Sequence, residues 1–373
     1  MITVIQIDPK NHKQRQLFKR IASVIYANNS QWVPPLAYEA EKVFHPSRCS
    51  FYDHGEATFL VAMQDDRAVG RLAVLNNEAY NAYNQEKTAF FYLFESISDR
   101  SVTSKLFEKA FQWARQRELT HMEGPRGFSV FDGMGMLVKG FEHRPAFGIP
   151  FNLPYYPELI ESVGFETHRE LLSGYLGTDI HFPEKVIQLA ELLKQKKGFS
   201  VLDMNSQSEL RQGVRRLKDM YNAALVGTSG NAPLTDADLD SMTKGLLWIA
   251  DPKLIKLILK DDEAVGFLLA YPDISAALQR CRGHLLPFGW LQILIEARRT
   301  QWLNINGAGI VEKYRRSGAT AILFTELYRS VTSGQFSHAD VVQIGTENEA
   351  MLLELQKIGV DFYKTHRTYQ RAL

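Results

Sequence analysis

A diverged internal repeat is the feature of this 373-residue chain that most constrains its fold. The segment DDRAVGRL at residues 65–72 recurs as DDEAVGFL at residues 261–268, with six identities in eight positions at an offset of 196. Residues 158–169 are echoed at 354–367, where the shared Glu-Leu, Gly and Thr-His-Arg keep their order at offsets of 195 to 198. We therefore expect two copies of one structural unit instead of a single large core.

Each copy has the pattern of a hairpin followed by alternating helices and strands. Apolar runs flank the Asp-Asp turn in both copies, which predicts an antiparallel hairpin. An amphipathic helix follows, with its apolar face over 106–114 in the first copy and 323–331 in the second. A strand, a helix and a last strand complete the unit. This order predicts an α/β (α+β) fold in which each copy is a mixed twisted sheet with helices on both faces.

The repeat also predicts the domain boundaries. Residues 1–180 form the first copy, residues 181–204 connect the copies through a charged helix and a strand, and residues 205–373 form the second copy. The offset rises from 196 at the hairpin to 217 at the amphipathic helix, so the second copy has an insertion within 274–300. The first copy gains a similar length within 121–150.

Composition excludes several classes of partner. The chain has 43 Lys and Arg against 42 Asp and Glu, so it lacks the basic field that binds nucleic acid. Two cysteines cannot make a disulfide framework or a thiolate zinc site, which fits a reducing compartment. The start of the chain does not resemble a secretory signal, and no apolar run is long enough to span a membrane. We expect a cytoplasmic protein without a nucleic-acid or membrane partner.

The second copy contains a predicted phosphate-binding turn. Residues 301–311 read as a strand that loosens at two glycines, with Gly309, Ile310 and Val311 at its end. The turn that follows offers free backbone N–H groups at a helix N-terminus, a glycine that lets an anion approach, and two guanidinium groups. Its residues are Arg315, Arg316, Ser317, Gly318, Ala319 and Thr320. The alternative is that Ser317 only caps the helix and the arginines are solvated.

The first copy provides an internal control for this turn. At the same offset, Ser101 stands opposite Gly318 and Asp99 stands opposite Arg316. A carboxylate at a helix start stabilises the helix but repels a phosphate. The first copy is therefore expected to be structural and the second to bind a ligand.

These residues resemble the GNAT superfamily of N-acetyltransferases, in which an Arg/Gln-x-x-Gly-x-Gly/Ala turn holds the pyrophosphate of acetyl coenzyme A. Residues 315–320 fit that pattern except at Thr320. The resemblance implies a bulged, splayed strand over 306–311 and a following helix that opens at Asn348 beside the coenzyme. Trp-Val-Pro-Pro-Leu at 32–36 and the Gly-Pro at 124–125 are similar to a group of bacterial tandem-GNAT proteins. The expected co-substrate is acetyl-CoA or another acyl-CoA.

The catalytic groups are less well specified. The resemblance implies a Tyr seven residues after Asn348 as the acid, but Leu355 stands there. Tyr363 and Tyr369 are alternatives, although strand aromatics are usually structural. Glu347 is the candidate catalytic base because it follows the predicted strand 341–345, while the alternative is that it charges the first turn of the next helix.

Other motifs give weaker signals. The histidine spacing fits no known metal motif, so no metal is expected. The loop 227–233 is either a substrate lid or a connector, and Thr235 with Asp238 resembles a capping box. Aromatic residues at 155–156 and 288–290 either line a pocket or, as aromatic clusters more often do, belong to the core.

The predicted function is transfer of an acyl group from acyl-CoA to an amine by the second copy, with a degenerate first copy. The acceptor is a small molecule or a peptide, and its identity, like the oligomeric state, is not encoded in a recognisable pattern. Two alternatives remain: a non-catalytic acyl-CoA sensor, and an aminoacyl or peptidyl transferase on the same duplicated fold.

Overall fold

A computed structural model describes residues 1–129, 132–178, 182–225, 232–238, 240–241, 250–315, 317–332 and 335–373. The chain divides into two compact units, each made of separate stretches of sequence. Unit 1 comprises Met1–Leu172, Ser275–Trp290 and Lys364–Leu373, and unit 2 comprises Ser173–Ile274 and Leu291–Tyr363. These compact units are defined by contacts within the folded chain, whereas the predicted boundaries divide the chain by its sequence repeat. The units therefore do not test the repeat boundaries, which stay a prediction.

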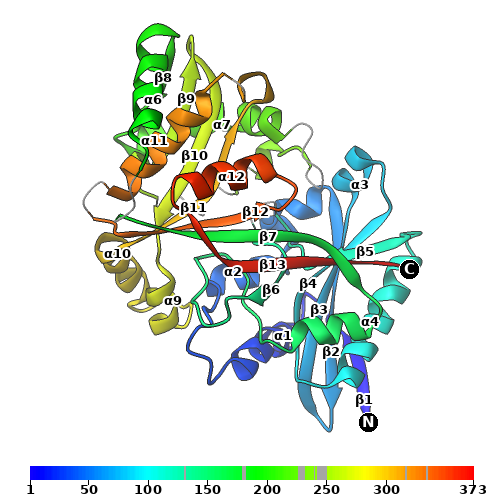
Figure 1. Ribbon diagram of the computed structural model, residues 1–373. Helices are drawn as coiled ribbons and strands as arrows, with labels where there is room; N and C mark the ends of the chain where they lie inside the picture. The colour runs from blue at the N-terminus through cyan, green and yellow to red at the C-terminus, as the bar shows by residue number, and fades with distance from the viewer. Residues whose placement is uncertain are drawn as a thin grey trace. The chain divides into compact units, whose positions relative to one another are not determined.

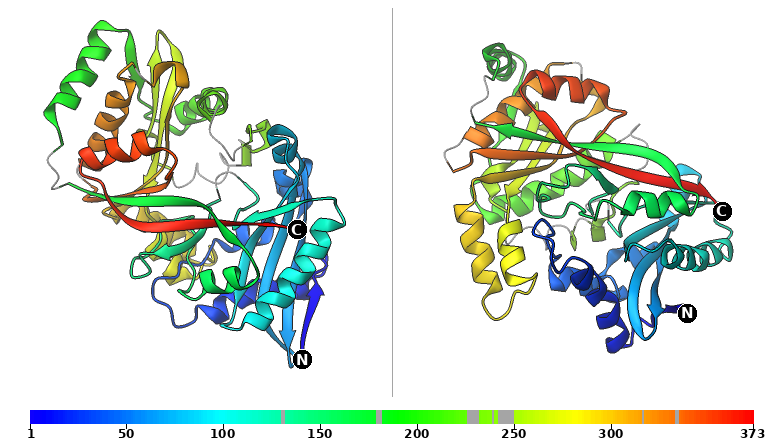
Figure 2. Two further views of the ribbon diagram at one scale, coloured as in Figure 1. Left: turned by 45° about the vertical axis from the view of Figure 1, so that its right-hand side comes forward. Right: turned by 60° about the horizontal axis from the view of Figure 1, so that its bottom comes forward.

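Unit 1 is a sheet with strand order β1-β2-β3-β4-β5-β13 and with β6 also paired to β13 (Figure 1). The hairpin β2–β3 and the helix α4 form its centre, and the left view of Figure 2 shows α4 lying along the strands. Its elements are β1 (Ile2–Gln6), α1 (His12–Ile25), α2 (Ala37–Lys42), η1 (Pro46–Arg48), η2 (Ser50–Asp53), β2 (Gly55–Gln64), β3 (Arg67–Asn77), α3 (Glu78–Asn84), β4 (Thr88–Ser96), α4 (Arg100–Arg115), β5 (His121–Gly124), β6 (Met136–Lys139), α5 (Tyr156–Ser162), the first part of β7 (Glu166–Gly177), α9 (Ser275–Cys281) and the last part of β13 (Asp361–Ala372).

Unit 2 has the strand order β7-β12-β11-β10-β9-β8. The helices α6 and α11 lie side by side on its sheet, as Figure 1 shows. Its elements are the second part of β7, α6 (Glu184–Lys196), β8 (Phe199–Leu202), α7 (Gln207–Leu225), η3 (Pro252–Leu254), β9 (Ile255–Lys260), β10 (Glu263–Pro272), nearly all of α10 (Gly289–Arg299), β11 (Trp302–Ile310), η4 (Glu312–Tyr314), α11 (Ala319–Thr332), β12 (His338–Gly345), α12 (Glu349–Lys357) and the first part of β13.

The two copies share one topology, as the repeat predicts. The pairs β1–β2, β2–β3 and β3–β4 are antiparallel and β4–β5 is parallel, and β8 to β12 repeat this series. A helix, α4 or α11, connects the parallel pair in each copy. The last strand of each copy divides between the units: β7 begins in unit 1 and ends in unit 2, and β13 does the reverse. Each sheet is therefore completed by a strand from the other copy.

The hairpin turns explain why the repeat is best preserved there. Asp65 and Asp66 have φ values of 47° and 63°, and Asp261 and Asp262 have φ values of 51° and 69°. Two successive residues with positive φ make a type I′ turn, whose twist matches that of the flanking strands. Asp tolerates this region better than most residues, which accounts for the conserved pair within the repeat.

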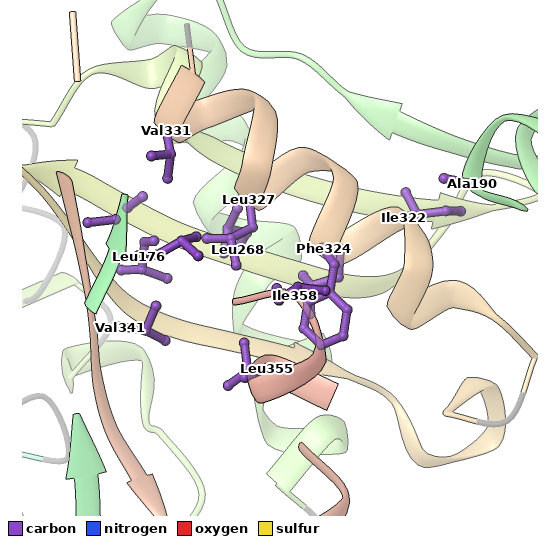
Figure 3. Close-up of a cluster of buried hydrophobic side chains, with 14 of the residues drawn as sticks. Leu176, Ala190, Leu268, Ile322, Phe324, Leu327, Val331, Val341, Leu355 and Ile358 are labelled. Carbon is purple, nitrogen blue, oxygen red and sulfur yellow. The ribbon is translucent and has the colours of Figure 1, made fainter. Parts of the chain in front are cut away.

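The core of unit 2 lies between its sheet and the helices α6, α11 and α12. Figure 3 shows Leu327 of α11 beside Leu268 of β10, and Phe324 of the same helix beside Ile358 and Leu355. In unit 1, α4 buries the face that contains Leu106, Phe107 and Ala110, as its periodicity predicts. Both amphipathic helices predicted from the sequence are thus confirmed.

Candidate functional site

The strands β11 and β12 run together at one end and part at the other. Their parallel register covers Trp302↔His338 to Ile305↔Val341. Beyond that point β11 continues to Ile310 and β12 to Gly345 without further pairing between them. We call this opening the second fork. It leaves backbone groups of β11 available to a ligand lying between the strands.

The second fork opens only on its β12 side, because β11 stays on β10. Gly266 pairs with Ile310 and Leu268 with Ala308, and the register then shifts before Ala270↔Ile305. Gly307, with φ of 148°, lies in this bulge. A bulge of this kind redirects a strand locally, which explains why β11 leaves β12 at this position. The splayed segment predicted over 306–311 is present.

The first copy has a similar fork. The β4–β5 register ends at Phe90↔Glu123, and Leu93, with φ of 51°, lies in the equivalent bulge. The N–H of Arg126 donates to the Phe91 carbonyl at 2.9 Å at the base of this fork, because Phe91 corresponds in register to Ile305, the last paired residue of β11. The equivalent N–H in the second copy, that of Gln343, donates instead to the Ser173 hydroxyl at 3.1 Å.

A buried polar group also occupies β4 in the first fork. Glu95 accepts hydrogen bonds from the hydroxyls of Tyr26 and Tyr156, each at 2.7 Å, and lies 3.4 Å from Arg71. Burial raises the pKa of Glu95, against the charge of Arg71 and the tyrosine hydrogen bonds. At the position that corresponds to Glu95 in the strand register, the second copy has Gly309. The second fork therefore lacks the side chain that fills the first.

The predicted phosphate turn follows β11. Arg315 donates from Nε to the Ile310 carbonyl at 3.1 Å, which holds the arginine stem against the end of β11. The Ser317 hydroxyl accepts from the N–H of Ala319 at 3.4 Å. Ser317 therefore caps the helix, as the alternative interpretation expects, and this bond does not prevent an anion from binding at the turn. Arg316 lies outside the described residues. Gly318 has φ of 87°, and a Cβ there would lie 3.0 Å from Leu193, so both backbone and space require glycine.

In the first copy the corresponding helix start is occupied by a carboxylate. Asp99 accepts from the N–H of Ser101 at 2.8 Å and from its hydroxyl at 2.6 Å. These hydrogen bonds lower the pKa of Asp99. The structural role predicted for this turn is confirmed. The capping residue of the second copy is Ser317, one position later than the repeat alignment places it.

The remaining predicted site residues lie after β12. Asn348 caps α12 by accepting from the N–H of Met351 at 3.4 Å, and Val311 follows the end of β11. Glu347 is exposed, and its carboxylate lies against Gly345. A Cβ added at Gly345 would lie 2.5 Å from a carboxylate oxygen of Glu347. Whether these residues or the others at 309–320 contact a ligand stays a prediction.

The expected acid position is part of the core. Leu355 is 3% exposed and packs with Ile358 in the unit 2 core, where Figure 3 shows both on or beside α12. Tyr369 lies in unit 1, where its hydroxyl is 3.4 Å from Glu161, so it is separate from the second fork. Tyr363 lies in unit 2 with its hydroxyl bonded to Asp340.

A polar sheet face beside the second fork was not found from the sequence. Leu303 and Ile305 of β11 point into the core, so the alternating Asn304 and Asn306 point to the opposite face. Asn304 donates to Asp273 at 3.1 Å, and Asn306 donates to the Tyr271 hydroxyl at 2.6 Å. Together with Asp340 these residues form what we call the polar face. Its members lie on β11 and β12 and on or directly after β10. These strands are far apart in sequence, so no short sequence motif contains the whole face.

The polar face is buried and hydrogen-bonded. Asp273 is 4% exposed, Asn304 is 1% exposed and Asp340 is 2% exposed. Burial raises the pKa of the Tyr271 and Tyr363 hydroxyls, and the Asp340 charge adds to the effect on Tyr363. Both phenols therefore stay protonated, so the Tyr363 hydroxyl can donate to Asp340. Asn304 and Asp340 are register partners, one position before Ile305↔Val341, which is the last pair before the strands part.

A cavity of about 640 Å³ lies elsewhere in unit 2, along the later turns of α11. Its Lys194 and Arg329 are paired with Glu326, and its Lys256 is paired with Asp203. Most of the cationic side chains in the described lining are thus paired with carboxylates of unit 2, so we regard the cavity as a weaker candidate than the fork.

Several other predictions have a structural outcome. Thr235 and Asp238 form the predicted capping box, with reciprocal hydrogen bonds of 3.1 Å. Tyr156 belongs to the core, but Phe288 is 68% exposed and Trp290 is 45% exposed, so the core interpretation of 288–290 is wrong. Of the loop 227–233, residues 227–231 lie outside the described part of the chain. Within the described part, no helix meets the length and hydropathy needed to cross a membrane, and no group of three metal-ligating side chains occurs.

Comparison with known proteins identifies the fold. No family model matches the chain. It is 25% identical over 374 residues to a bacterial ceramide synthase from Caulobacter vibrioides, covering 98% of this chain and 97% of that protein. It is 24% identical over 370 residues to Protein YghO from Escherichia coli, covering 97% and 94%. A tandem GNAT protein from the clavulanic acid biosynthesis pathway superposes with a TM-score of 0.56 at 10% identity, covering 100% of this chain and 98% of that chain.

The tandem GNAT fold predicted from the sequence is therefore confirmed as a fold. A GCN5-related N-acetyltransferase from Sphaerobacter thermophilus also superposes, with a TM-score of 0.51 at 13% identity, covering 100% of this chain and 95% of that chain.

Proposed function

We propose that this chain is an acyl-CoA-dependent N-acyltransferase whose reaction takes place at the second fork. The observation that carries the proposal is the contrast between the forks: in the first, β4 carries the buried Glu95, bound by Tyr26 and Tyr156, and in the second the corresponding position of β11 is Gly309.

The open segment suits the arm of an acyl-CoA. From Asn306 to Ile310, β11 spans about 13 Å at ~3.3 Å per residue, which an extended pantetheine arm can cover. The phosphates would lie at the turn 315–320, beside the helix N-terminus of α11. The thioester end would then lie near Asn306, where the strands meet.

This direction distinguishes the two candidate carboxylates. Because β11 and β12 are parallel, Gly345 is level with Gly309, and Glu347 follows at the wide, phosphate end of the fork. Asp340 lies at the narrow end, next to the expected thioester. We therefore assign the proton-accepting role to Asp340, and the earlier hypothesis for Glu347 becomes the alternative.

The proposed step is an aminolysis. The acceptor ammonium gives one proton to the Asp340 carboxylate, and the free amine attacks the thioester carbon to form a C–N bond. The C–S bond breaks, and the thiolate leaves with a second proton from the nitrogen. The Tyr363 hydroxyl, bonded to Asp340, orients that carboxylate. An acid at the position of Leu355 is not needed, since a thiolate is a good leaving group.

The acceptor we propose is the amine of a long-chain amino alcohol. Support comes from the relative described as a ceramide synthase, which aligns over nearly its whole length. The polar face adds carboxylate and amide groups that can bind an ammonium with a neighbouring hydroxyl.

A second candidate is an acyl-CoA sensor without turnover. The observation that favours it is Leu355, which fills the usual acid position with a core side chain.

The test is to assay release of free CoA thiol from acetyl-CoA and from a long-chain acyl-CoA with a panel of amines, including sphingoid bases. Mass spectrometry of gently purified protein checks in parallel for a retained acyl-CoA. Turnover with a long-chain base supports the proposal. Retained acyl-CoA without turnover on any amine favours the sensor, and absence of both rejects acyl-CoA as the ligand.

A further inference from the structure

The insertion of the second copy contains a run of exposed apolar side chains before and within α10. Between α9 and α10, Leu286 is 80% exposed and Phe288 is 68% exposed. Within α10, Trp290, Leu291 and Ile295 are 45%, 42% and 41% exposed. Surface apolar residues are common singly, but five within ten residues of sequence form a patch that calls for an explanation.

This run is held firmly, so it forms a fixed apolar edge. A Cβ on Gly289 would lie 1.8 Å from the His284 carbonyl oxygen, which shows how closely the start of α10 approaches the preceding turn. The N–H of Trp290 donates to the Leu285 carbonyl at 2.9 Å. At the other end, Gln335 donates to the Ala297 carbonyl at 3.1 Å and so satisfies the last turn of α10.

One face of α10 is apolar and exposed, and its end is basic. Leu291, Ile295 and Arg298 recur at helical spacing on the solvent side, while Ile293 is fully buried on the other side. The segment 280–299 contains four arginines, all exposed, and a single acidic residue, Glu296. The combination of Trp, Phe and Leu with flanking arginines is typical of helices that lie in a membrane interface.

We propose that α10 and the residues just before it dock the protein on the surface of an anionic lipid bilayer. Phe288, Trp290 and Leu291 would enter the headgroup region, and Arg298 and Arg299 would meet the lipid phosphates. The charge of this segment selects a lipid surface over a second copy of the chain, because two such arginine-rich edges repel each other. This departs from the expectation of no membrane partner, and it does not rest on the proposed reaction.

The experiment measures binding of the full chain to sedimented vesicles, without substrate. Vesicles of phosphatidylcholine alone are compared with vesicles of equimolar phosphatidylcholine and phosphatidylglycerol. We expect at least tenfold stronger binding to the anionic vesicles, since each arginine near the surface adds about 1 kcal/mol. The double variant Phe288→Ser/Leu291→Ser should lose binding at least tenfold. The control Val24→Ser/Tyr83→Ser, which removes side chains 60% and 52% exposed on α1 and α3, should bind like the wild type.

A milder variant keeps the test independent of folding defects. Vesicles should shift the tryptophan emission of the wild type to shorter wavelength, and Trp290→Phe should abolish that shift while still binding. Equal binding by the wild type and the Phe288→Ser/Leu291→Ser protein would overturn the proposal. A wild type that ignores vesicles but dimerises through this edge, as shown by a monomeric double variant in analytical ultracentrifugation, would also overturn it.

Discussion

The two forks begin from the same backbone and end with different roles. In both copies a bulge, at Leu93 or Gly307, follows a short parallel pairing. In the first copy Glu95 of β4 binds two tyrosines, and Asp99 caps the helix start. In the second copy Gly309 corresponds to Glu95, and Ser317 caps the helix start.

This comparison teaches that two forks of one topology differ through the side chains that line them. A buried carboxylate with three partners is costly to displace, because breaking the group leaves an uncompensated charge or hydroxyl. The following predictions test whether the contrast is functional, from the largest expected effect to the smallest.

The largest effect is expected for Asp340→Asn. Loss of the proton acceptor should lower turnover about 100-fold or more, while acyl-CoA binding measured by calorimetry stays the same. Glu123→Gln is the matched control, because Glu123 has the same register position in the first copy. Equal losses in the two variants would show that the forks do not differ in this way.

A carboxylate placed at Ser317 should convert the second helix start into the first. Ser317→Asp should keep or slightly raise the free energy of unfolding, since a carboxylate suits a helix N-terminus. It should weaken CoA binding more than tenfold, which is 1.4 kcal/mol, through repulsion of the phosphates. Calorimetry with CoA measures this.

The control for that variant is Asp99→Ser in the first copy. It should leave the free energy of unfolding nearly unchanged, because Ser and Asp cap helices about equally well, and it should leave CoA affinity unchanged. Undiminished CoA binding by a folded Ser317→Asp protein would remove this turn from the site.

The smallest effect concerns stability and pH. Burial lowers the pKa of His366 to about 4, and this neutral ring contacts the Pro150 carbonyl at 3.0 Å. The unfolded chain, with a His pKa near 6.5, binds the proton first as the pH falls. His366 should therefore reduce stability between about pH 6.5 and 4, with a slope approaching 1.4 kcal/mol per pH unit.

Denaturant unfolding of His366→Gln across this range should show a flatter pH dependence. His168 occupies the same place in the repeat, lies partly exposed and is 3.9 Å from Glu123, so His168→Gln should keep the steep acid limb. A slope unchanged in His366→Gln would contradict the burial argument.

Local chemistry made much of the fold predictable. The Asp-Asp pairs fix hairpin turns through their positive φ, and helical periodicity fixes the buried faces of α4 and α11. The capping role of Asp99 is also local, because its carboxylate accepts from the N–H of Ser101, only two residues later in the sequence. The core assignment of Phe288 and Trp290 failed, because composition does not say whether an apolar segment finds a partner.

The sequence by itself determined that the chain is a duplication with a tandem GNAT fold, and that the two helix starts differ in charge. Only the tertiary structure decided that Glu95 of the first fork is buried between two tyrosines, that each last strand completes the sheet of the other copy, and that Asp340 lies beside Asn304 and Tyr363. The physical reason is range. Turn type, capping and amphipathicity depend on residues a few positions apart, whereas strand register and the polar face depend on pairing between segments that are distant in sequence.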